Sequence, residues 1–142
     1  MGDPFRGWGR VLSHHGPDEA HHCHRFRLGG RDWALCARCL ALYPILLAVV
    51  ALEVRFGRFV TEDRWFFAAT LITPAVIDWS RSRLFGAMGA NWIRSITGAL
   101  AGAGLGLSFT DYLKDSNPTW VWVLWGTLAG IIVLVWSRRP PL

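Results

Sequence analysis

Four apolar runs, with the charged residues placed between and around them, constrain this chain more than any other feature. The runs extend over residues 40–54, 65–79, 92–112 and 120–136. They are apolar on all sides rather than striped, and most end at a Trp or Tyr, as membrane helices do at the lipid–water boundary. A soluble four-helix bundle is the alternative, because the first two runs are shorter than the ~20 residues that a membrane helix usually needs. We predict an all-α membrane protein with a bundle of four transmembrane helices.

The composition fits a protein whose main partner is the lipid bilayer. Hydrophobic residues make up 52% of the chain and charged residues 18%. The net charge of +5 does not indicate a nucleic-acid partner, because the basic residues flank the apolar runs. Residues 1–20 contain Arg6 and Arg10 but no apolar run behind them, which is unlike a secretory signal peptide.

The distribution of Lys and Arg predicts the orientation of the bundle. Four spans place both termini on the same side of the membrane. The basic residues of that side are Arg6, Arg10, Arg25, Arg27, Arg31, Arg38, Arg81, Arg83, Arg94, Arg138 and Arg139, and those of the other side are Arg55, Arg58, Arg64 and Lys114. The positive-inside rule therefore predicts a multi-pass protein of the inner (cytoplasmic) membrane with both termini in the cytoplasm. It divides the chain into a cytoplasmic segment 1–39, the bundle 40–136 and a cytoplasmic tail 137–142.

A β-hairpin is predicted before the first apolar run. Gly29-Gly30 stands between two strand-like segments, and a two-residue type I′ turn needs positive φ at both central positions. Counting outward from this turn, Phe26 faces Trp33 and Cys23 faces Cys36. The cysteine pair falls at a non-hydrogen-bonded position of the ladder, where side chains lie closest.

The hairpin brings together a cluster of thiols and imidazoles. Cys23, Cys36 and Cys39, with His24 as the fourth ligand and His21 or His22 as alternates, would complete a tetrahedral zinc site. Two other interpretations remain. Cys36 and Cys39 could form a redox-active dithiol at a helix N-terminus, or the cluster could have no chemical role. A reducing cytoplasm favours a metal-bound or catalytic thiol over a static disulfide.

A second group of polar residues is expected at the same side of the membrane. Asp78 closes the second apolar run and Arg94 opens the third, so both lie near one membrane depth. An unpaired charge there is costly, and we predict a contact between them that is direct or passes through a single water. Arg38 and Tyr43 are within reach of this pair. These four residues form a candidate catalytic pocket for a membrane-associated, lipid-like substrate.

Small residues recur at helical spacing in the last two apolar runs. Gly98, Gly102 and Gly106 lie four residues apart, and so do Gly126 and Gly130. Such stripes let helix backbones approach closely. We interpret both as packing faces, which would also allow a homo-oligomer.

The motifs resemble a known family. Cys23-His24, then Cys36-Ala37-Arg38-Cys39, Asp78 and the later Asn91-x-x-Arg94 are similar to the small prokaryotic membrane proteins called domain of unknown function 2085. The chain departs from the family pattern after Cys39, where members usually have Thr-Gly. The resemblance implies a multi-span membrane protein with the Cys/His motif at one face, and it implies no activity.

Three classes of function therefore follow from the sequence. The first is a membrane protein with a zinc site that is structural or supports chemistry. The second is a thiol oxidoreductase at the membrane surface, and the third is a non-catalytic small subunit or transporter. The residues leave open whether the protein is an enzyme.

Overall fold

The computed structural model describes residues 21–59, 62–86, 89–115 and 117–138, as two strands and four helices. The strands are β1 (Cys23–Leu28) and β2 (Arg31–Cys36), and the helices are α2 (Ala37–Phe56), α3 (Arg64–Phe85), α4 (Asn91–Lys114) and α5 (Thr119–Ser137). The prediction that residues 1–20 are not a signal peptide lies outside the described residues. Most of the predicted tail 137–142 lies outside them as well. The four helices and the hairpin are confirmed.

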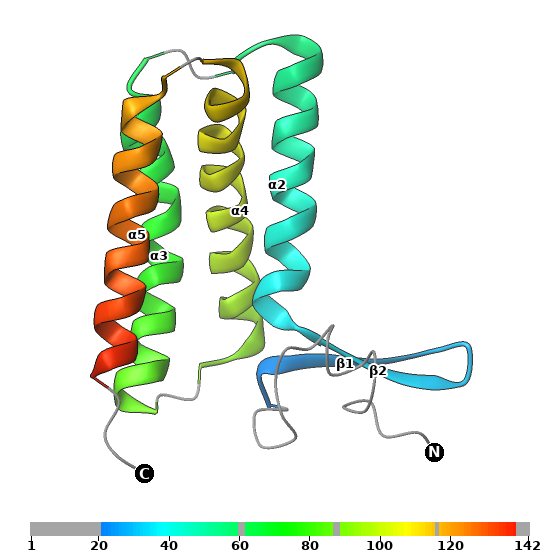
Figure 1. Ribbon diagram of the computed structural model, residues 1–142. Coiled ribbons are helices and arrows are strands. Elements are labelled where there is room, and N and C mark those ends of the chain that lie inside the picture. Colours follow the sequence, from blue (N-terminus) through cyan, green and yellow to red (C-terminus); the bar gives the residue numbers. More distant parts are fainter. Residues whose placement is uncertain (1–20, 60–61, 87–88, 116, 139–142) are drawn as a thin grey trace.

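The helices run alternately up and down (Figure 1). The starts of α2 and α4 lie at the end of the bundle that carries the β-hairpin, together with the ends of α3 and α5. We call this end the hairpin end and the opposite one the far end. Each helix is longer than the apolar run that predicted it, because the polar residues at its ends continue the helical backbone. Helix α3, for example, continues beyond Trp79 to Phe85.

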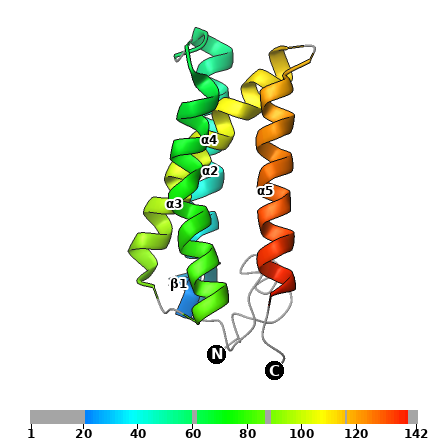
Figure 2. The same cartoon turned by 90° about the vertical axis from the view of Figure 1, so that its left-hand side faces the viewer.

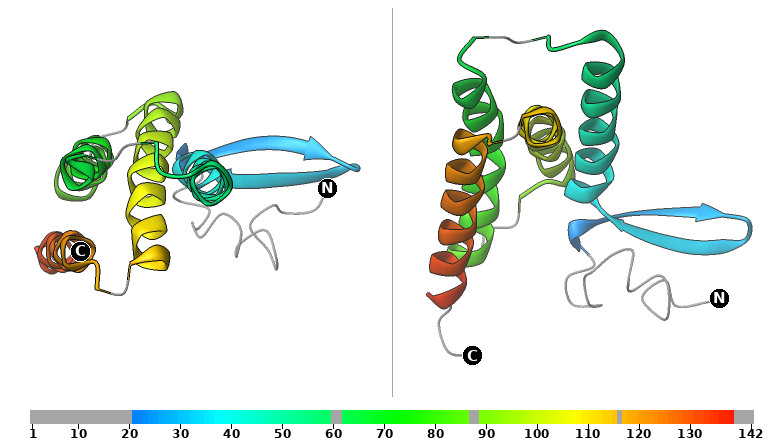
Figure 3. Two further views of the ribbon diagram at one scale, coloured as in Figure 1. Left: turned by 90° about the horizontal axis from the view of Figure 1, so that it is seen from above. Right: turned by 45° about the horizontal axis from the view of Figure 1, so that its top comes forward.

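Helix α4 is the centre of the bundle and packs between α2 and α3 (Figure 3). Its glycines make this possible. A Cβ on Gly98 or Gly102 would collide with a backbone carbonyl of α2, at Arg38 and Leu42 respectively. A Cβ on Gly104 would lie 2.6 Å from the Ala68 carbonyl of α3. The glycine stripe of the third apolar run is therefore a packing face, as predicted.

Helix α5 stands beside the other three (Figure 2). At the far end Trp125 donates a hydrogen bond from Nε1 to Ser108 Oγ of α4 at 3.1 Å. At the hairpin end the guanidinium of Arg83 lies over the ring of Trp136, 5.0 Å from its centroid. Gly126 and Gly130 have no atom within 4 Å of an added Cβ. Within the described part of the chain, these two glycines therefore do not serve as a packing face between helices, whereas the stripe of α4 packs on α2.

Among the described residues, two helices, α2 and α5, are long and apolar enough to cross a membrane. Only 6% of the most apolar stretch of α2, and 11% of that of α5, is buried inside the molecule. A helix in the core of a soluble protein would be mostly buried, so these exposed apolar surfaces suit lipid better than water. Helices α3 and α4 do not meet the same criterion, since α3 carries several charges and α4 is rich in small residues. Membrane crossing is thus indicated for two of the four predicted spans.

Candidate functional site

The hairpin forms with the register that its turn predicts. Gly29 and Gly30 have φ values of 60° and 74°, both in the left-handed region that a type I′ turn requires. Cys23 pairs with Cys36, and Phe26 pairs with Trp33. The hairpin then continues directly into α2, so that Cys36 is the residue that caps the helix N-terminus. The predicted juxtaposition of Cys23 and Cys36 is confirmed at the level of the strand register.

The three thiols meet where the hairpin joins α2. Cys23 and Cys36 are buried, whereas Cys39 is partly exposed, and all three are free thiols. The thiol of Cys39 lies within hydrogen-bonding range of Cys36. Cys39 belongs to the first turn of α2, where unpaired backbone N–H groups favour negative charge. Cys36 is thus the central thiol, with Cys23 across the ladder on one side and Cys39 one turn along on the other.

His24 is held by α4 rather than by the cysteines. Its Nε2 lies 3.0 Å from Ser95 Oγ, and the same hydroxyl donates to the carbonyl of Ala37 at 3.1 Å. A hydroxyl has one proton to donate, so Nε2 of His24 must be the donor toward Ser95. The neutral ring then carries its free lone pair on Nδ1, which is the nitrogen left to accept a proton or bind a metal ion. Ser95 was not singled out by the sequence.

The described part of the chain contains no group of three or more His, Cys, Asp or Glu side chains arranged to hold a metal ion. The rings of His21 and His22, the alternate ligands, lie against each other at an angle of 46°, with centroids 3.9 Å apart. The geometry therefore gives no support to the zinc site predicted from Cys23, His24, Cys36 and Cys39.

The charged residues of the hairpin end pair differently from the prediction. Asp78 of α3 forms its ion pair with Arg38 of α2. The direct contact predicted between Asp78 and Arg94 is not among the ion pairs of the described residues. The stem of Arg38 passes over Gly98 of α4, where a Cβ would lie 3.0 Å from its Cγ. Glycine at position 98 thus leaves room for Arg38 to reach across α4 to α3.

Arg94 is a buried cation next to the thiols. Its side chain is 3% exposed, and it donates a 3.4 Å hydrogen bond to Asn91 Oδ1. Asn91 in turn donates to the carbonyl of Cys23 at 3.2 Å. The Nη2 of Arg94 has no hydrogen-bond partner among the described residues. Arg94 lies close enough to Cys36 and Cys23 to interact electrostatically with both.

The hairpin end therefore has one cation more than carboxylates among these contacts, and of the two arginines Arg94 is buried while Arg38 is 20% exposed. Arg38 and Arg94 contribute two cations, and Asp78 contributes one carboxylate that is already paired. An unpaired buried cation is destabilising unless an anion lies close by. A thiolate of the cysteine cluster would supply that anion. Tyr43, the fourth residue of the predicted pocket, is 60% exposed and takes no part in these contacts.

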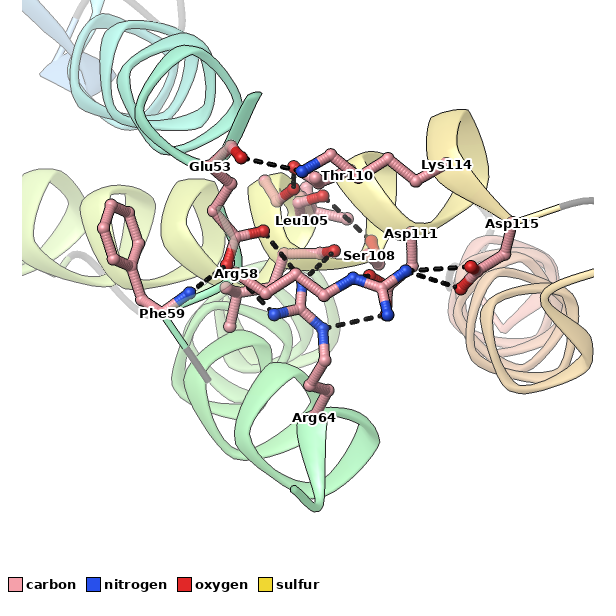
Figure 4. A network of polar contacts seen from close by, with 12 residues as sticks. Glu53, Arg58, Phe59, Arg64, Leu105, Ser108, Thr110, Asp111, Lys114 and Asp115 are labelled. Atoms are coloured by element: carbon pink, nitrogen blue, oxygen red, sulfur yellow. Dashed lines mark hydrogen bonds and ion pairs between the residues drawn. The ribbon is translucent and has the colours of Figure 1, made fainter. Parts of the chain in front are cut away.

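A second polar network closes the far end of the bundle, and the sequence did not predict it (Figure 4). Arg64 of α3 donates to both oxygens of Glu53 in α2, at 3.0 Å and 2.8 Å, and to Asp111 of α4 at 2.9 Å. Glu53 is 0% exposed and Asp111 is 2% exposed. Arg58 approaches Asp111 at 3.3 Å and binds Asp115 at 2.8 Å. Lys114, which donates to the carbonyl of Glu53 at 2.7 Å, adds a third cation to the two arginines and three carboxylates. The network is therefore a clamp between three helices.

The comparisons with known proteins give one match. The model of the family described as "Predicted membrane protein (DUF2085)" matches residues 20–108, which include the hairpin, α2, α3 and most of α4. No curated protein matches the chain, and no solved structure matches it.

Proposed function

We propose, from the premise that this chain belongs to the DUF2085 family of predicted membrane proteins, that it is a membrane-bound thiol oxidoreductase. Its working residues would be Cys36 and Cys39. The observation that carries the proposal is the contact between these two thiols at the N-terminus of α2. Two thiols that contact each other across a Cys-x-x-Cys at a helix N-terminus are placed to exchange between a dithiol and a disulfide.

Groups that would stabilise a thiolate stand around Cys36. The first turn of α2 offers backbone N–H groups to a negative sulfur, and the buried guanidinium of Arg94 supplies a cation. The contact between the thiols lets the S–H of one stabilise the thiolate of the other. A thiolate is the form of cysteine that attacks a disulfide.

The exchange follows from the exposure of the two sulfurs. Cys39 is the more exposed, so its sulfur meets a substrate disulfide first. The proton of Cys39 passes to the Cys36 thiolate as the Cys39 sulfur attacks, and the substrate S–S bond breaks as a mixed disulfide forms. The first substrate thiolate leaves and takes up a proton. Cys36 then attacks the sulfur of Cys39, which forms the Cys36–Cys39 disulfide and releases the second substrate thiol. The substrate has gained two electrons and two protons, and a dithiol reductant restores the pair.

The side of the membrane is part of the proposal. The basic residues described at the hairpin end are Arg25, Arg27, Arg38, Arg81, Arg83, Arg94 and Arg138, against Arg55, Arg58, Arg64 and Lys114 at the far end. The positive-inside rule favours the cytoplasm for the end with more arginines. In that reducing compartment Cys36 and Cys39 are both reduced at rest, and they act on disulfides of substrate molecules.

A zinc site is the second candidate, and one observation favours it. Because Nε2 of His24 is the donor to Ser95, Nδ1 is free to bind a metal ion. A zinc-bound histidine commonly donates its other ring N–H in this way. To bind zinc, the sulfurs of Cys23, Cys36 and Cys39 and the Nδ1 of His24 would have to surround one ion. The described side chains are not arranged in this way.

Single serine substitutions separate the two candidates. The full-length protein in detergent is assayed for catalysed reduction of a small aromatic disulfide, measured against the dithiol reductant alone. For an oxidoreductase, Cys36→Ser and Cys39→Ser abolish turnover, whereas Cys23→Ser retains it. For a zinc site, the purified protein carries about one equivalent of zinc, and all three variants and His24→Ala lose it alike. Metal-free protein whose thiols show no exchange would refute the proposed function.

A further inference from the structure

The β-hairpin projects sideways from the bundle instead of folding back under it. Figures 1 and 3 show β1 and β2 extending past α2, roughly across the direction of the helices. If α2 crosses a membrane, a hairpin in this position lies along the membrane surface. The proposed thiol chemistry does not require this arrangement, so the inference stands apart from it.

The two faces of the hairpin differ in character. Side chains alternate along a strand, so Phe26 and Leu28 share the face of His24. Leu35 and Trp33 join that face from β2, opposite His24 and Phe26. The other face of β1 presents Cys23, Arg25 and Arg27. By the register, Arg31 stands opposite Leu28 at the tip of the first face, and Ala34 stands opposite Arg25 on the second. The first face is thus mainly apolar and aromatic, and the second, the arginine face, carries Arg25 and Arg27.

The base of the hairpin is buried and its outer part is exposed. Cys23, Ala34 and Cys36 of the arginine face are buried. The apolar face approaches α4 through His24, which reaches Ser95 just over one turn inside that helix. Phe26 is 40% exposed and Leu28 is 67% exposed, so the bundle itself does not cover this face. Leu40 and Leu47 on the adjoining part of α2 are also exposed.

We infer that the hairpin rests on the lipid surface of the membrane beside α2, with Phe26, Leu28 and Trp33 in the interfacial layer. Aromatic and aliphatic side chains partition to this depth, and arginines remain with the headgroups or water. The hairpin cannot go deeper, because its two outer edges carry backbone groups that need water or headgroups as partners. It would continue the lipid-facing surface of α2 outward along one leaflet.

A photo-cross-linking amino acid tests the inference position by position. The full-length protein is reconstituted in nanodiscs with benzophenone-alanine at residue 26 or 28, and the matched controls carry it at residue 25 or 27. We expect lipid adducts several-fold more abundant at 26 and 28 than at 25 and 27. Equal yields on both faces would overturn the inference, and so would adducts at 26 and 28 that join two copies of the protein.

A second measurement avoids any substitution. In the wild-type protein, methyl signals of Leu28 are observed by NMR in nanodiscs that contain headgroup-labelled nitroxide lipid or a soluble gadolinium chelate. The inference predicts strong relaxation by the lipid label and weak relaxation by the chelate. The reverse result would place Leu28 in water and overturn it.

Discussion

Arg64 holds the far end of the bundle together, and its replacement by leucine is the sharpest test of that clamp. Arg64 is 6% exposed and donates to Glu53, Asp111 and the carbonyl of Leu107. Leucine keeps much of the apolar stem of the side chain but removes every donor. Glu53, which is fully buried, would lose both of its contacts with the guanidinium. Asp111 would retain only the approach of Arg58 at 3.3 Å.

Removing one partner of a buried ion pair costs about 3–5 kcal/mol, because the remaining charge stays buried without compensation. The largest part of the loss should fall at Glu53, whose remaining side-chain hydrogen bond comes from the amide of Phe59 at 3.2 Å. Arg64→Lys keeps the charge but loses the planar fork that serves two carboxylates, and should cost about 1.5–3 kcal/mol. Against a total stability of about 5–15 kcal/mol, the loss in Arg64→Leu is easily measured.

Reversible unfolding in mixed micelles with increasing SDS gives these free energies. Arg55→Leu is the matched control, because Arg55 is exposed near the same end, and it should change stability by less than about 0.5 kcal/mol. The double variant Glu53→Leu with Arg64→Leu should be more stable than Arg64→Leu alone. The clamp argument fails if Arg64→Leu behaves like the control, or if the two substitutions are additive.

Three further predictions concern the packing, the turn and the second ion pair. Gly102→Val should cost about 1–3 kcal/mol, because its side chain would collide with α2, whereas Gly126→Val should change SDS unfolding by less than about 0.5 kcal/mol. Gly29→Val places a β-branched residue at φ 60° and should weaken the hairpin by about 1–2 kcal/mol. Hydrogen exchange should then rise in β1 and β2 only, and faster exchange throughout the helices would contradict the reasoning. A double-mutant cycle of Arg38→Ala and Asp78→Asn should give a coupling of about 0.5–3 kcal/mol, and an additive result would mean a solvated pair.

The local features of the fold could be predicted because they depend on neighbouring residues. Gly29-Gly30 sets the turn, and the turn sets the register of Cys23 with Cys36, since side chains alternate regularly along each strand. The glycine spacing in α4 predicted a close helix contact but not its partner. The four-residue spacing defines one face of α4, but it does not determine how α4 is rotated relative to the other helices. Only the structure shows that this face packs on α2 rather than on α5.

The charged residues were harder to place for the same reason. Asp78 and Arg94 lie at similar depth, which suggested a pair, yet Arg38 reaches Asp78 first because Gly98 leaves a path across α4. At the far end, no partner was predicted for Glu53 or Asp111, although both stand at the ends of apolar runs. Both lie at the same depth as Arg64, and charged residues at one depth can pair, as was expected of Asp78 and Arg94.

The position of Glu53 and Arg64 also bears on how the chain enters the membrane. The two residues stand close together at the turn between α2 and α3, and their side chains bind each other directly. A nascent α2 inserted alone would carry an uncompensated carboxylate near the lipid, which is unfavourable. As soon as α3 follows, Arg64 neutralises it, before Asp111 has been synthesised. We therefore expect α2 and α3 to insert as one helical hairpin, with α4 arriving later to fill the space between them.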